Sequence, residues 1–129
     1  MPTGDPRAAA SLARRASLLV TSRYHPAVFA APAGVPILAL TADDYTTVKL
    51  TGALEAWGQA QVHDLDLAAS PRLGPALRRA ASTATAARLA AGNALPAARA
   101  AAAVWWDRVA VAASVLPVDE PSPAESRRP

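Results

Sequence analysis

The fold is decided by residues 18–40, which read LLVTSRYHPAVFAAPAGVPILAL. Residues 18–21 and 35–40 are short apolar runs with the length of buried strands. Between them, residues 25–31 predict a helix with Pro26 at its first position, where the missing N–H costs nothing. A strand, a helix and a second strand in this order are typical of a parallel sheet with a helical crossover.

The segments on both sides continue this alternation. The further elements that the pattern predicts are a helix from Asp5-Pro6 to about Ala16, a helix over Tyr45 to Trp57 capped by Asp43 or Asp44 and ended by Gly58, and a weaker strand over residues 60–65. We therefore expect an α/β fold with a short parallel sheet. Three short strands make a narrow sheet, which favours a part of a larger architecture over a complete enzyme.

The second half of the chain is alanine-rich and predicts two helices, over residues 71–92 and about 95–116, with Gly92-Asn93 as the break. On the second helix, Trp105 lies on an ordinary core face, whereas Trp106 points away from it and is expected to be partly exposed. Residues 117–129 are rich in proline and charge and are expected to form a disordered tail. The predicted domain is residues 1–116.

Composition excludes several classes of protein. The chain has 129 residues, 52% of them hydrophobic, and a formal net charge of +3, so it is not fully disordered. It has no cysteine, which excludes a disulfide scaffold and a cysteine zinc site. The arginines are scattered and Lys49 is the only lysine, so a nucleic-acid partner is not expected. Neither a transmembrane segment nor a signal peptide is indicated, and the expected location is the cytoplasm.

The residues with chemistry gather between the first strand and the next helix. Arg23 and His25 follow the carboxyl end of that strand, where open α/β sheets bind their ligands. On an extended chain their side chains share one side, and Tyr24 points to the other side, toward the core. Arginine binds carboxylate or phosphate groups, and histidine transfers protons near neutral pH. The alternative is that His25 caps the helix and that Arg23 pairs with Asp43 or Asp44.

A resemblance favours the first interpretation. Residues 5–58 resemble the C-terminal part of the polysaccharide pyruvyl transferase family. The motifs that carry the resemblance are Ser22-Arg23-Tyr24-His25-Pro26, Val28-Phe29-Ala30, Gly34-Val35-Pro36, Asp43-Asp44-Tyr45 and Val48-Lys49-Leu50-Thr51-Gly52-Ala53-Leu54. It implies a Rossmann-like domain, one half of the two-domain GT-B architecture, whose N-terminal domain is missing here.

The resemblance also implies a function. The family transfers pyruvate from phosphoenolpyruvate to hydroxyls of cell-surface polysaccharides as a ketal. By this resemblance, Arg23 and Lys49 bind phosphoenolpyruvate, and His25 is the catalytic residue. A sugar or polysaccharide precursor is the acceptor, and no metal or other cofactor is expected. Without the missing domain the chain is expected to be inactive.

Two other classes of function stay open. A nucleotide-sugar glycosyltransferase or epimerase of the same architecture needs a glycine-rich turn and a ribose-binding glutamate, but Gly34 is isolated and Glu55 is the nearest candidate. A non-catalytic remnant or interaction module is favoured by the missing domain. His63, Asp64 and Asp66 are interpreted as a solvated turn at the end of the third strand, with the rim of a pocket as the alternative.

Overall fold

A computed structural model describes residues 5–115, which divide into two compact units. We call Met1–Pro96 the sheet unit and Ala97–Pro129 the helical unit. The expected tail, residues 117–129, lies outside the described residues. The elements of the described chain are α1 (Pro6–Arg15), β1 (Leu19–Thr21), α2 (Tyr24–Ala30), η1 (Ala31–Ala33), β2 (Ile37–Thr41), α3 (Asp44–Glu55), β3 (Val62–Asp64), η2 (Leu65–Ala69), α4 (Leu73–Ser82) and α5 (Ala84–Val115).

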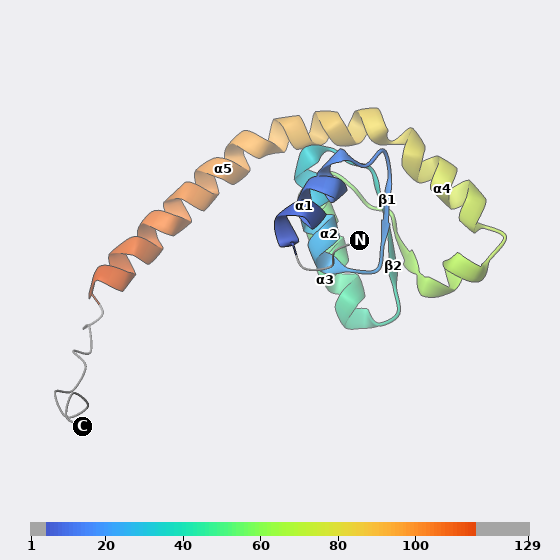
Figure 1. Cartoon of the computed structure of the whole chain (residues 1–129), viewed down its shortest axis with the longest axis horizontal. Coiled ribbons are helices and arrows are strands. Elements are labelled where there is room, and N and C mark those ends of the chain that lie inside the picture. Colours follow the sequence, from blue (N-terminus) through green and yellow to red (C-terminus); the bar gives the residue numbers. More distant parts are fainter. Residues whose placement is uncertain (1–4, 116–129) are drawn as a thin grey trace, which may run out of the picture. The chain divides into compact units, whose positions relative to one another are not determined.

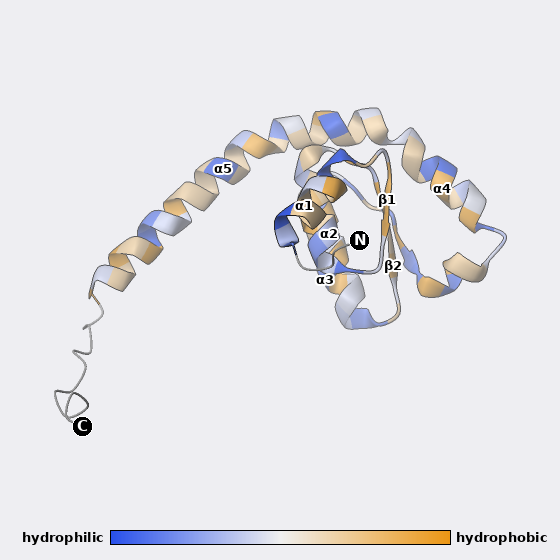
Figure 2. Ribbon diagram, in the orientation of Figure 1, coloured by the Kyte–Doolittle hydropathy of each residue, from blue (hydrophilic) through white to orange (hydrophobic). Residues whose placement is uncertain are grey.

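The sheet has three parallel strands in the order β1-β2-β3 (Figure 1). The expected mixed α/β fold with a short parallel sheet is confirmed. β2 is the central strand and is buried along its whole length, and Figure 2 colours it as hydrophobic. β1 and β3 have only three residues each, so the sheet offers little surface for packing.

Helices cover both faces of the sheet. Ile37 and Ala39 of β2 pack into a core with α1, α2 and α3, which includes Leu50 and Leu54. The alternate residues Leu38 and Leu40 face the other side and pack against η2 and α4. This alternation is the period of two of a β-strand, so one short strand supplies both cores.

The first part of α5, within the sheet unit, closes the end of the sheet where the strands begin (Figure 1). Gly34 and Gly58, which precede β2 and β3, both have a φ of 70°. A Cβ at Gly34 would lie 2.7 Å from Cα of Arg88, and one at Gly58 would lie 2.9 Å from Cβ of Ala90. The two turns therefore fit against α5 only because they lack side chains. The carboxyl ends of the strands lie at the opposite edge.

A buried glutamine anchors the start of β2. The amide of Gln59 donates to the carbonyl of Val35 at 3.0 Å and accepts from the N–H of Ile37 at 2.9 Å. Pro36 lies between these two groups and has no N–H of its own. The Gln59 side chain therefore satisfies the backbone at this point as a neighbouring strand would do.

The helix ends confirm some predictions and correct others. Asp5 caps α1, and its carboxylate accepts from the N–H of Arg7 at 2.9 Å. The predicted break at Gly92-Asn93 is wrong, because α5 runs through both residues. The chain breaks at Thr83 instead, where the Thr83 hydroxyl and N–H both bond back to the carbonyl of Ala80.

The helical unit consists, in its described part, of residues 97–115 of α5. Trp106 is 62% exposed, as expected. The expected core face is wrong, because Trp105 is 55% exposed. The described part of this unit contains no second helix or strand that could bury that face. Within residues 5–115, no helix combines the length and the apolar character that crossing a membrane requires.

Candidate functional site

The candidate site lies where the carboxyl ends of the three strands meet, which we call the open edge of the sheet. Thr21, Thr41 and Asp64 end the three strands there. The turn after β1 leads into α2, and the turn after β2 leads into α3, so the first residues of both helices lie at this edge (Figure 1). Parallel strands leave such an edge for ligands because their connecting helices begin around it.

The turn after β1 is held by a threonine. The Thr21 hydroxyl accepts from the N–H of Arg23 at 2.9 Å and donates to the carbonyl of Arg23 at 3.2 Å. Arg23 is the N-cap of α2, with an exposed side chain that forms no capping hydrogen bond. The turn therefore fixes the backbone of Arg23 and leaves its guanidinium at the surface.

The helix α2 starts one residue earlier than the sequence predicts. Because Tyr24 is already helical, the extended alternation that directs Tyr24 to the core does not apply. Tyr24 is 37% exposed, and its ring meets the ring of His25 edge to face at 5.8 Å between centroids. The alternative that His25 caps the helix is also wrong, because α2 has no side-chain cap.

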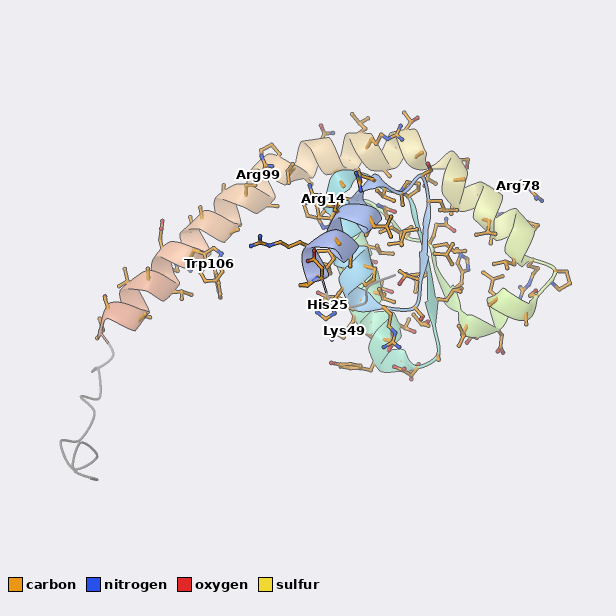
Figure 3. The ribbon with its side chains drawn as sticks, in the orientation of Figure 1. Arg14, His25, Lys49, Arg78, Arg99 and Trp106 are labelled. Atoms are coloured by element: carbon orange, nitrogen blue, oxygen red, sulfur yellow. The ribbon has the colours of Figure 1, made fainter. Side chains whose placement is uncertain are left out.

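Lys49 joins this group from α3. Its Nζ lies 4.9 Å from the ring centroid of Tyr24 and 4.9 Å from that of Tyr45. An ammonium over two aromatic faces is held by cation–π attraction, which limits where the long side chain can go. His25 and Lys49 therefore each lie next to the ring of Tyr24. The two labelled side chains come from different helices (Figure 3).

The start of α3 is acidic, and its first acidic residue, Asp43, caps the helix. Asp43 caps the helix through the N–H of Thr46 at 2.7 Å and the Thr46 hydroxyl at 3.0 Å. These two hydrogen bonds, the backbone bond first, hold the pKa of the Asp43 carboxyl below its ordinary value of 3.8. The carboxylate of Asp43 is therefore used in capping α3, and Asp44 adds a second negative charge beside it.

A chain of hydroxyls joins α3 to the strands. The hydroxyl of Thr47 lies 2.8 Å from that of Thr41, which donates to the carbonyl of His63 at 3.3 Å. Thr47 also reaches the carbonyl of Asp43 at 2.9 Å. These bonds fix the first turn of α3 on the sheet, and with it the position of Tyr45 and Lys49 farther along the same helix.

The end of β3 belongs to a turn. The Asp64 carboxylate accepts from the N–H of Asp66 at 2.8 Å and so caps η2. The ring of His63 lies 3.1 Å from the side-chain oxygen of Gln61. Asp64 and Asp66 are exposed, as expected for a solvated turn, whereas His63 is a half-buried residue of β3. Across residues 5–115, no three side chains of His, Cys, Asp or Glu are close enough to hold a metal ion.

Of the two tyrosines next to Lys49, Tyr45 could be foreseen from the sequence and Tyr24 could not. Tyr45 and Lys49 are four residues apart on α3 and so share a helix face, which was a visible signal. The partner ring of Tyr24 was not visible, because it depends on how α2 packs on α3. The basic group therefore consists of Arg23, His25 and Lys49 on an open surface that contains two aromatic rings.

Comparison with known proteins adds no relative. No family model matches the chain, no curated protein is similar to it, and no solved structure matches its fold. The resemblance of residues 5–58 to pyruvyl transferases therefore rests on the sequence motifs alone.

Proposed function

We propose that this chain is the donor-binding part of a bacterial, cytoplasmic polysaccharide pyruvyl transferase. Its Rossmann-like sheet unit would form one half of a GT-B enzyme and bind phosphoenolpyruvate at the open edge. The observation that supports the proposal best is that His25 and Lys49 each lie next to the ring of Tyr24, the residue that follows the exposed Arg23.

The charges of this group suit the donor. Phosphoenolpyruvate carries a carboxylate and a phosphate on adjacent positions of a small molecule. Arg23 presents two parallel N–H donors to one of these anions, and Lys49 presents a point charge to the other. Asp43 and Asp44 at the start of α3 repel anions. We therefore expect the donor to bind on the side of the open edge where α2 begins.

The reaction would use His25 as a general acid. A proton from the imidazolium adds to the methylene carbon of phosphoenolpyruvate, and the second carbon becomes electrophilic. One sugar hydroxyl attacks that carbon, and its proton leaves with the phosphate group. A second hydroxyl of the same sugar then attacks the same carbon to close the ketal, and its proton returns to the imidazole of His25. Arg23 and Lys49 would stabilise the departing phosphate.

Binding of the sugar acceptor would need a second domain that covers the outer face of α3. Tyr45 and Val48 on the outer face of α3 are both 72% exposed. Exposed large apolar groups beside a charged site are typical of a face that another domain covers. We therefore expect the isolated chain to bind the donor and to lack transferase activity.

Binding of phosphoenolpyruvate, measured by calorimetry on the whole chain, tests the proposal. Arg23→Ala should weaken binding by about 1.5–3 kcal/mol, the value of a charge-assisted hydrogen bond. Arg79→Ala is the matched control, because it removes an exposed arginine from α4 on the other face of the sheet. Absence of binding, or equal losses in the two variants, would overturn the proposal. Preference for a nucleotide sugar would favour the glycosyltransferase alternative instead.

A further inference from the structure

The helical unit presents an apolar face that its own described residues do not cover. Val104, Val111 and Val115 are 52%, 66% and 78% exposed. A shallow depression follows the same face and is lined by Val104, Asp107, Arg108, Val111 and Ala112. Figure 2 shows hydrophilic residues between the hydrophobic ones along this part of α5.

Helix geometry arranges these residues in a simple pattern. At 100° per residue, Val104 and Val111 point in directions only about 20° apart, and their mean defines the middle of the face. Val115 lies about 30° from that middle. Asp107 and Arg108 flank the middle at about 50° on opposite sides. A narrow valine stripe therefore has one negative and one positive border at nearly the same height.

We propose that a second copy of this chain covers this face, with the two helices parallel and in register. Twofold symmetry along the helix axes sets each residue opposite itself, so Val104 meets Val104 and Val111 meets Val111. The same symmetry brings the Asp107 border of one helix against the Arg108 border of the other. Each Asp107 then lies beside the Arg108 of the second copy, which gives two reciprocal ion pairs around the valine contacts.

Charge distinguishes this arrangement from the others. In an antiparallel pair centred between Asp107 and Arg108, each border meets itself, so Asp107 faces Asp107 and Arg108 faces Arg108. A lipid surface would have to accept the carboxylate of Asp107 within the apolar face, and Arg99, the other basic residue among positions 97–115, lies on the opposite side. The parallel pair is the arrangement in which both charges find a partner.

Single cysteines test the contact directly, because the chain has none of its own. Val104→Cys should form a disulfide-linked dimer under mild oxidation, since facing positions of a parallel pair bring the Cα atoms within disulfide reach. Ala113→Cys is the matched control, because it lies on the opposite side of the helix and is also exposed. Equal crosslinking of the two variants would overturn the proposal.

A mixture of Val104→Cys and Val111→Cys chains tests the direction. Parallel helices give mainly the two like-with-like products. Efficient crosslinking of position 104 to position 111 would show antiparallel helices and contradict the proposal.

Charge reversal supplies a test that does not depend on oxidation. Asp107→Arg and Arg108→Asp should each weaken self-association, measured by sedimentation equilibrium, by about tenfold, because each turns two attractive pairs into repulsive ones. The double variant Asp107→Arg/Arg108→Asp should return to the wild-type value, because the pairs are restored in exchanged form. A monomeric wild type, or a double variant as weak as the singles, would contradict the pairing. Neither result bears on the binding of phosphoenolpyruvate, so the two proposals fail separately.

Discussion

At the scale of single residues, glycine decides how closely the turns approach α5. Gly34→Ala forces a side chain into a φ of 70° and against the backbone of Arg88. We expect a loss of about 2–4 kcal/mol in the free energy of unfolding, from strain and overpacking together. Urea denaturation followed by circular dichroism measures this loss.

Gly52→Ala is the matched control for this prediction. Gly52 lies inside α3 and is exposed, and a Cβ added there would meet nothing within 4 Å. The substitution should stabilise the chain by about 0.5–1 kcal/mol, because alanine loses less conformational entropy in a helix than glycine does. If Gly34→Ala were as mild as Gly52→Ala, the contact between the turn and α5 would be wrong.

Gln59 is a second residue with an effect beyond its size. Gln59→Leu leaves the carbonyl of Val35 and the N–H of Ile37 buried without a partner. We expect a loss of about 2–4 kcal/mol in the free energy of unfolding. Gln61→Leu is the control, since its side chain forms the part-buried hydrogen bond to His63 and bonds no buried backbone group, and it should cost less than about 1 kcal/mol. Similar losses in the two variants would argue against a structural role for the Gln59 amide.

Asp43 predicts a pH dependence of stability. Its pKa is lower in the folded chain than 3.8, so its contribution is present above that value. The contribution is lost as the pH falls from about 3.8 through the lowered pKa, because the folded state must then take up the proton. Asp43→Asn should therefore flatten the acid limb of the stability curve, measured by urea denaturation at a series of pH values.

Thr46→Val refines this test. It removes the hydroxyl bond to Asp43 and keeps the stronger contribution of the backbone N–H, so it should flatten the acid limb only in part. An acid limb that is identical in the wild type and in Asp43→Asn would show that other groups cause the dependence.

At the scale of elements, α5 is distinguished by a proline in its interior. Pro96 has no N–H for the carbonyl of Gly92 and lies at the boundary between the two units. Pro96→Ala should restore this bond and stabilise the helix locally by about 1–3 kcal/mol. Hydrogen exchange should slow at the amides around position 96, and unchanged or faster exchange there would contradict a continuous helix.

The elements also show where sequence patterns succeed. Residues 18–41 contain apolar runs of strand length separated by a proline-started helix, and those local signals predicted β1, α2 and β2 to within a few residues. The break between α4 and α5 was missed for a physical reason. Gly92-Asn93 is a good helix end in isolation, but Gly92 ends a helix only with a positive φ, which it does not have here. Thr83 was the true stop, and threonine is a weak local signal.

The candidate site was predictable only in part. The sequence placed Arg23 and His25 at the start of the helix that follows the first strand, and Lys49 inside the helix that follows the second strand. It misplaced Tyr24, since one residue of difference in the start of α2 turns that side chain from the core to the surface. The contact between Tyr24 and Lys49 depends on the packing of α2 on α3, and the local patterns that predict each helix do not specify how two helices pack on each other.

At the scale of the sheet unit as a whole, the two edges of the sheet differ. The edge where the strands begin is closed by tight glycine turns against the first part of α5. The edge where they end carries exposed basic and aromatic side chains. This asymmetry is the physical basis for assigning ligand binding to one edge.

Titration of the isotope-labelled chain with phosphoenolpyruvate, followed by two-dimensional NMR, tests that assignment most directly. We expect saturable shifts at Arg23, Tyr24, His25 and Lys49, and none at Gly34, Gly58 or Ala90 on the closed edge. Shifts that concentrate on the closed edge, or no saturable shifts at all, would contradict donor binding at the open edge.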